Sequence, residues 1–276
     1  MFLDTVILVL QEILEAALII SVFLALIRHF HDLKPGSFTP GHLWIPAAVL
    51  IGVSGAWIYA FYMPDITQWF DYVGLEIVNS ALQIMIIILL LCFCYMVTLE
   101  RLEKSPRLNL LVAICLTLLV SLGIIREVSE IIIYAQGILS NPENYSPVLL
   151  GSLIAIGIGA SSGIILYYVL INLHGLWGLR ICLILLALFA GNMASQASLL
   201  LIQADWLPYT VELWDSSALL PEYSVTGQLL YALIGYEANP SLLQVCVYIG
   251  AVLLILTSPL FLLSWRYNNM QAVSNS

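Results

Sequence analysis

The amino-acid sequence predicts an all-α integral membrane protein that crosses the bilayer seven times. Of its 276 residues, 62% are hydrophobic and only 9% are charged. Apolar runs of roughly 20 residues, the length that a membrane-spanning helix needs, recur along the whole chain. The few Lys and Arg residues fall between alternate runs, as they do in multi-pass proteins. We therefore expect residues 1–276 to form a single polytopic membrane domain.

The predicted spans follow the apolar runs: 3–27, 43–63, 74–98, 108–139, 148–171, 180–203 and 241–264. An outer loop, 204–240, separates the last two. Within this loop, residues 226–236 are apolar but too few to cross the membrane, so they favour a short amphipathic or re-entrant helix. Asp215, Ser216 or Ser217 is suited to cap this helix or a neighbouring turn.

Positive charge predicts the orientation. Apart from Arg126, every basic residue lies after the first span, between spans three and four or five and six, or after the seventh: Arg28, Lys34, Arg101, Lys104, Arg107, Arg180 and Arg266. By the positive-inside rule these connections are cytoplasmic. The N-terminus is then outside and the C-terminus inside.

The opposite, outer connections carry carboxylates and no Lys or Arg. We expect six of them to form an acidic outer mouth that raises the local cation concentration: Asp65, Asp71, Asp205, Asp215, Glu222 and Glu237. The alternative is that each is an ordinary solvated loop residue.

Charged residues also lie inside two of the predicted spans. Arg126, Glu127 and Glu130 interrupt the fourth span, and Glu12 and Glu15 interrupt the first. A charge at bilayer depth costs at least ~2.5 kcal/mol, so it is tolerated where it faces protein or a water-filled path. Each Glu pair is three residues apart, about 60° around a helix, and so shares one face. Four carboxylates from two facing helices would make an oxygen cage suited to hard cations.

The recurrence of Glu-x-x-Glu three spans apart predicts two inverted-topology repeats, about 1–99 and 108–203, with the span at 241–264 added. Transporters built in this way place their substrate site at the repeat interface. The third and sixth spans also carry amides, including Asn79, Gln83, Asn192 and Gln196. These side chains are suited either to line a polar path or to form hydrogen bonds between helices.

Several other classes of protein lack support in the sequence. The net charge of −9 provides no basic surface for nucleic acid. The five cysteines lie in apolar runs without the spacing of a zinc site, and no histidine lies at mid-depth where a haem would need it. Carboxylate di-iron enzymes use Glu-x-x-His, which no span contains. We therefore expect neither an enzyme nor a permanently bound cofactor, and no cleavable signal peptide is evident.

Together these residues resemble the oxidase-dependent high-affinity iron permeases of the iron/lead transporter superfamily, whose signature is Arg-Glu-x-x-Glu in spans one and four. Arg126, Glu127 and Glu130 match the second copy in full. Glu12 and Glu15 match the acidic positions of the first copy, whereas Gln11 stands where the family usually has Arg. The stretch from Trp214-Asp215-Ser216-Ser217 to Gly235-Tyr236 is also similar to the family's last third.

The resemblance implies a permease of the plasma membrane, the inner membrane in a bacterium, that takes up iron. The metal ligands would be Glu12, Glu15, Glu127 and Glu130, supported by Arg126 and Gln11. It also implies an extracytoplasmic oxidase or iron-binding protein as a partner, besides the iron ion and the lipid bilayer. A permease for another hard or divalent cation, or a scaffold or sensor that transports nothing, remains an alternative. The sequence does not predict an oligomeric state.

Overall fold

A computed structural model describes residues 2–33, 43–102, 106–139, 143, 145–174, 176–221 and 224–258. These residues form helices and connecting turns and contain no strand beyond an isolated bridge between Glu212 and Ser241. The helices are α1 (Phe2–Leu33), α2 (Trp44–Thr67), α3 (Trp69–Tyr72), α4 (Gly74–Leu102), α5 (Pro106–Ile138), α6 (Tyr145–Ile171), α7 (Leu176–Gln203), α8 (Val225–Ile234) and α9 (Leu242–Leu256).

Six of these helices are long and apolar enough to cross a membrane: α1, α2, α4, α5, α6 and α7. They coincide with the first six predicted spans, which are thereby confirmed as helices. The chain is therefore an all-α, multi-pass membrane protein. The seventh predicted span, 241–264, overlaps α9, which is apolar but only 15 residues long and ends at Leu256 with Thr257 as its C-cap. The residues beyond 258, and with them the rest of that span, lie outside the described part of the chain.

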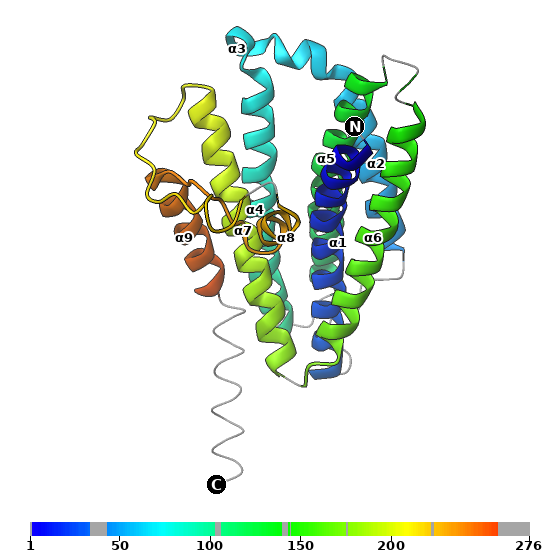
Figure 1. Cartoon of the computed structure of the whole chain (residues 1–276). Helices are drawn as coiled ribbons and strands as arrows, with labels where there is room; N and C mark the ends of the chain where they lie inside the picture. The colour runs from blue at the N-terminus through cyan, green and yellow to red at the C-terminus, as the bar shows by residue number, and fades with distance from the viewer. Residues whose placement is uncertain are drawn as a thin grey trace.

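The long helices stand side by side in one bundle (Figure 1). Helix α1 packs mainly along α6, and α2 packs mainly along α5. Helix α4 packs against both α5 and α7, and α9 packs against α7. Buried Leu, Ile, Val and Phe side chains of α1, α4, α5 and α7 form the core between these helices. The bundle thus encloses the faces of α1 and α5 that carry the predicted Glu pairs.

Small residues allow two of the helix pairs to approach closely. A Cβ atom at Gly163 of α6 would lie only 2.8 Å from the Cβ of Ala17 on α1. In the same pair, the Ser21 hydroxyl donates to the Gly163 carbonyl over 2.8 Å. In the α2–α5 pair, the Ser121 hydroxyl donates to the Ala48 carbonyl over 3.1 Å. Such backbone contacts substitute for the hydrophobic driving force that helices lack within lipid.

The outer loop enters the bundle as α8, which packs against α1 and α7 and lies about halfway along them (Figure 1). This confirms a helix in the apolar stretch of the loop. Its N-cap is Ser224, whose hydroxyl accepts from the Gly227 amide over 3.0 Å. Asp215 does not cap it; its carboxylate accepts from the Ser217 amide over 2.9 Å in a neighbouring turn. Helix α8 ends at Gly235, whose φ of +68° suits glycine and closes the helix in a left-handed turn.

A short reversal, α3, joins α2 to α4 at the same end of the bundle as the start of α1 (Figure 1). Its residues Phe70, Asp71 and Tyr72 have φ values of 53°, 63° and 73°, in the left-handed region. Phe70 packs edge-on against Trp206, with ring centroids 6.0 Å apart. This contact ties the α2–α4 connection to the start of the outer loop, so that both lie at one end of the molecule.

Candidate functional site

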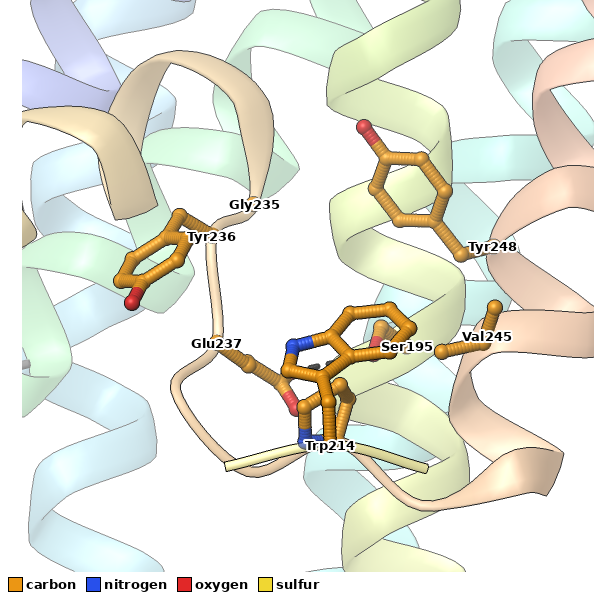
Figure 2. Close-up of a pocket in the computed structure, with 8 residues that line it drawn as sticks. Ser195, Trp214, Gly235, Tyr236, Glu237, Val245 and Tyr248 are labelled. Atoms are coloured by element: carbon orange, nitrogen blue, oxygen red, sulfur yellow. Dashed lines mark hydrogen bonds between the residues drawn. The ribbon is translucent and has the colours of Figure 1, made fainter. Parts of the chain in front are cut away.

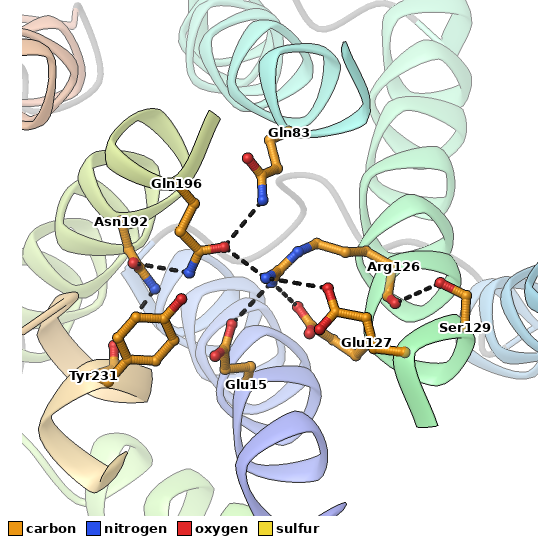
Figure 3. Close-up of polar contacts among 9 residues, drawn as sticks. Glu15, Gln83, Arg126, Glu127, Ser129, Asn192, Gln196 and Tyr231 are labelled. Atoms are coloured by element: carbon orange, nitrogen blue, oxygen red, sulfur yellow. Dashed lines mark hydrogen bonds and ion pairs between the residues drawn. The ribbon is translucent and has the colours of Figure 1, made fainter. Parts of the chain in front are cut away.

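The guanidinium of Arg126, on α5, lies at the centre of the charged cluster (Figure 3). Its Nη1 donates to Glu15 Oε2 on α1 over 3.0 Å and to Glu127 Oε1 over 2.7 Å. Its Nη2 lies 3.6 Å from Glu130 Oε1, one helical turn further along α5. The structure therefore brings three of the four predicted carboxylates around the guanidinium of Arg126. This agrees with the prediction that the Glu pairs of α1 and α5 face each other.

The fourth carboxylate, Glu12, lies beside Glu127 and interacts electrostatically with Glu15 and Glu130. All four predicted ligands thus gather in one place. Glu12, Glu15 and Glu127 are at most 5% exposed, whereas the side chain of Glu130 is 40% exposed. Glu130 is therefore the member of the cluster that an ion could reach first. Near it stands Tyr59 of α2, which interacts electrostatically with Glu130 and with Glu76 of α4.

The cluster has more acceptor oxygens than donors. Three carboxylate oxygens of the cluster are buried without a hydrogen-bond partner in the described part of the chain: Glu12 Oε2, Glu15 Oε1 and Glu127 Oε2. Four ionised carboxylates against one guanidinium would also leave a formal surplus of three negative charges. Buried, unpaired carboxylate oxygens are costly at membrane depth. Protons or a cation must offset this surplus, so the arrangement can accept a positively charged ligand.

No three Asp, Glu, His or Cys side chains of the described residues already stand in an arrangement that could hold a metal ion. The contacts of Arg126 give the physical reason. Its guanidinium occupies the space between Glu15 and Glu127 and takes one oxygen from each. A metal ion at this place would have to share these oxygens with Arg126 or displace the guanidinium from them.

Amide side chains complete the site on the side of α4 and α7 (Figure 3). Arg126 Nη2 donates to Gln196 Oε1 over 2.5 Å, and Gln83 Nε2 donates to the same oxygen over 3.0 Å. Gln196 Nε2 in turn donates to Asn192 Oδ1 over 3.0 Å. Of the two readings of these amides, hydrogen bonding between helices is confirmed for Gln83 and Gln196.

Sequence reasoning did not assign Gln83, Asn192 and Gln196 to the site. A signal was present, because Asn79-x-x-x-Gln83 in α4 recurs as Asn192-x-x-x-Gln196 in α7. This recurrence matches that of Glu-x-x-Glu in α1 and α5. Gln11, predicted as a supporting residue, is half-buried on α1. It takes no part in the hydrogen bonds that surround Arg126 in the described chain.

The predicted outer carboxylates do not act as one group. Asp65 in the last turn of α2, Asp71 in α3 and Asp205 just after α7 are all exposed. Asp215 is exposed in the outer loop, where hydrogen bonds from Ser217 hold the pKa of its carboxyl below its ordinary value. Glu222 lies outside the described residues.

Glu237, by contrast, is half-buried and held close to the central site. Ser195 Oγ of α7 donates to its Oε1 over 3.0 Å, and Gln244 Nε2 of α9 donates to its Oε2 over 2.5 Å. It borders a pocket of about 140 Å³ between α7, α9 and the outer loop, as Figure 2 shows. The other residues that line this pocket are Ser195, Trp214, Gly235, Tyr236, Pro240, Val245 and Tyr248. Since Ser195 precedes Gln196 on α7, the pocket lies next to the amides of the site.

Comparison with known proteins gives no relative. No family model matches the chain, and neither a curated protein nor a solved structure is significantly similar to it.

Proposed function

We propose that the protein is a membrane permease that moves iron ions into the cytoplasm, and that Glu12, Glu15, Glu127 and Glu130 bind the ion in transit. The observation that carries this proposal is the gathering of four carboxylates around Arg126, with three buried oxygens that have no partner in the described chain. Carboxylate oxygens suit hard cations such as ferric iron, and they also bind ferrous iron. The resemblance of Arg126-Glu127-x-x-Glu130 to the iron-permease signature favours iron over other cations.

In this proposal Arg126 holds the carboxylates together while no ion is bound. Its guanidinium contributes positive charge where a buried carboxylate would otherwise be unpaired. An arriving cation competes for Glu15 and Glu127, and the partly exposed side chain of Glu130 is its first contact. Because the guanidinium and the ion use the same oxygens, binding would loosen Arg126 from the cluster. That change couples the presence of the ion to the contact between α1 and α5.

We further propose that the chain contains two inverted repeats, α1–α4 and α5–α7, followed by a seventh span that begins with α9. The pattern of helix contacts supports the repeats. Exchanging α1 for α5, α2 for α6 and α4 for α7 converts the α1–α6 pair into the α5–α2 pair, and both pairs are in contact. It likewise converts α1–α7 into α5–α4, whereas α1–α5 and α4–α7 map onto themselves. A site between α1 and α5 would then lie at the repeat interface, where rocking of one repeat against the other gives alternating access.

The proposed orientation places the N-terminus outside and the C-terminus in the cytoplasm, with the protein in the plasma membrane, or the inner membrane of a bacterium. The positive-inside distribution of Lys and Arg supports it. Asp65, Asp71 and Asp205 would then lie at the outer mouth, where their charge attracts cations. An extracytoplasmic oxidase or iron-binding protein is the partner that the family resemblance suggests for delivery.

Metal binding by the purified protein in nanodiscs tests the proposal. We would titrate ferrous iron, a ferric chelate, manganese and zinc by calorimetry into the wild-type protein and the variants Glu15→Gln and Glu127→Gln. We expect one site that prefers iron and that both variants weaken by at least about tenfold, because each loses a charged ligand. Asp4→Asn, at the start of α1 and away from the cluster, is the matched control and should bind as the wild type does.

Transport separates the remaining alternatives. Cells that express the wild type should accumulate iron faster than cells that express Glu127→Gln. Tighter binding of manganese or zinc than of iron would replace iron by another cation as the substrate. Folded wild-type protein that binds none of these ions would contradict the permease and favour a scaffold or sensor in which Arg126 only neutralises the buried carboxylates.

A further inference from the structure

The side chain of Gln196 offers the guanidinium of Arg126 a neutral acceptor at Nη2, whereas Glu15 and Glu127 are bound by Nη1. Gln196 Oε1 accepts from Arg126 Nη2 over 2.5 Å, while Nη1 of the same guanidinium binds Glu15 and Glu127. Gln196 is 5% exposed and comes from α7, whereas the carboxylates come from α1 and α5. The guanidinium is thus held by side chains of three helices, α1, α5 and α7.

The acceptor orientation of Gln196 is itself enforced by its neighbours. Gln83 Nε2 donates to the same Oε1 over 3.0 Å, so a rotated Gln196 would bring its NH₂ group against two donors. Gln196 Nε2 donates to Asn192 Oδ1, and Asn192 Nδ2 points to the backbone carbonyl of Tyr231 on α8 at 3.4 Å. A backbone carbonyl is always an acceptor. The hydrogen bonds therefore all point the same way: Arg126 donates to Gln196, Gln196 to Asn192, and Asn192 to the carbonyl of Tyr231 on α8 (Figure 3).

Without Gln196, Glu130 is an alternative acceptor close to Nη2. Glu130 Oε1 already lies 3.6 Å from Nη2, just beyond a good hydrogen bond. A small movement of the guanidinium would close this gap and form a stronger, charge-assisted bond. Arg126 would then occupy an oxygen of the most exposed carboxylate of the cluster. By holding Nη2, Gln196 keeps Glu130 available.

We infer that Gln196, aligned by Gln83 and Asn192, is a positioning residue that holds Arg126 away from Glu130 and so sets the affinity of the carboxylate cluster for cations. This inference rests on the proposed function, because affinity for a cation has meaning only if the cluster binds one. It adds a role that the Glu-x-x-Glu pattern does not contain. It also links the outer helix α8 to the site through the orientation of two amides.

Three substitutions of Gln196 and its neighbour test the inference on the full chain in nanodiscs. Gln196→Leu removes the acceptor, Gln196→Glu keeps an acceptor for Arg126, and Gln83→Met removes the donor that aligns Gln196. We expect Gln196→Leu to weaken binding of ferrous iron or manganese by about tenfold, because Arg126 then competes for Glu130. Gln196→Glu should bind at least as tightly as the wild type, because it keeps the acceptor for Arg126 and adds a negative charge, and Gln83→Met should lie between Gln196→Leu and the wild type. Gln203→Leu, exposed near the end of the same helix, is the control and should leave the affinity unchanged.

A double-mutant cycle on thermal unfolding, measured without metal, keeps this inference separate from the proposed function. The cycle compares Arg126→Met, Gln196→Leu and the double variant. If Gln196 acts through Arg126, their effects on the unfolding midpoint will be strongly non-additive. If the cycle is non-additive but the wild type binds no metal, the contact between Gln196 and Arg126 stands. The proposed permease and the role of Gln196 in setting cation affinity are then both refuted. Wild-type affinity in folded Gln196→Leu, or an additive cycle, would overturn the inference itself.

Discussion

The guanidinium of Arg126 on α5 donates to the carboxylate of Glu15 on α1, with 3.0 Å between Nη1 and Oε2. These residues are 111 positions apart in the sequence, and each is less than 10% exposed. Their contact joins the first and fourth long helices at a depth where neither charge could be left alone. The stability of the bundle and the chemistry of the site therefore depend on the same ion pair.

Removing this guanidinium should lower the stability of the whole bundle, because the ion pair joins two helices. For Arg126→Met we expect a loss of about 3–5 kcal/mol in the free energy of unfolding, because buried carboxylates lose their only cationic partner in the cluster. Chemical denaturation in mixed micelles, followed by tryptophan fluorescence, measures the change.

Two companion variants show whether the loss comes from the cluster. Arg107→Gln, on the exposed first turn of α5, should change the unfolding free energy by less than about 0.5 kcal/mol. Adding Glu15→Gln to Arg126→Met should restore part of the stability, since one unpaired carboxylate disappears. Equal effects of Arg126→Met and Arg107→Gln would show that the buried ion pairs contribute nothing.

The close packing of α1 against α6 predicts different outcomes at two neighbouring glycines. A Cβ at Gly159 would collide with the side chain of Ile13, whereas a Cβ at Gly157 meets no other described atom within 4 Å. We expect Gly159→Ala to destabilise the bundle by about 1–3 kcal/mol through overpacking. Gly157→Ala, on the open side of the same helix, should be neutral or slightly stabilising. Thermal unfolding of both variants measures the difference, and matching midpoints would contradict the contact.

The turn at Asp215 predicts a pH effect in the outer loop. Its carboxylate accepts from both the backbone amide and the hydroxyl of Ser217, which lowers the pKa of Asp215. A lowered pKa stabilises this turn above the ordinary pKa of Asp, and the stabilisation is lost as the pH falls through the lowered value. Ser217→Ala should raise the pKa of Asp215 by removing one donor. Carboxyl ¹³C chemical shifts followed from pH 6 to about pH 2 measure this pKa; an unchanged value in Ser217→Ala would mean that the hydroxyl bond has no effect.

The sequence was most informative where apolar length and charge spacing carry the signal. Six spans could be predicted because a run such as that around Leu116 is apolar on all sides, as lipid requires. The meeting of Glu15 with Glu127 was foreseeable because charges within apolar runs must face protein. Both arguments use local patterns that no tertiary contact can reverse.

Other parts of the site depend on contacts that local patterns do not encode. Gln196 belongs to the site only because α7 lies against α4 and opposite Arg126. The half-buried position of Glu237 depends on donors from α7 and α9, so its place in the sequence suggested an ordinary outer-loop acid. Helix α8 begins at Val225, within one residue of the predicted start, and its N-cap is Ser224. Asp215 instead accepts from the Ser217 amide in a neighbouring turn, the second of the two roles that the sequence suggested for it.

A second guanidinium at position 11 tests the repeat relationship directly. Gln11 precedes Glu12 as Arg126 precedes Glu127, and Gln83 occupies in α4 the place that Gln196 occupies in α7. Gln196 Oε1 accepts from Arg126, whereas Gln83 Oε1 is buried without a partner in the described chain. If the two halves are equivalent, an arginine at position 11 will donate to Gln83 Oε1 and Glu12 Oε2. Gln11→Arg should then raise the free energy of unfolding by about 1–3 kcal/mol, because it satisfies buried acceptors.

Gln11→Arg should also lower the affinity of the cluster for cations, because its positive charge offsets one of the three surplus negative charges. Gln11→Met, which has similar length and no charge, is the matched control and should give neither effect. Unfolding in micelles and calorimetry with manganese measure the two consequences independently. A destabilised Gln11→Arg variant would show that position 11 faces away from Gln83, and that the two repeats differ at this position. Stabilisation together with weaker cation binding would establish that the two halves of the chain present equivalent positions to one shared site.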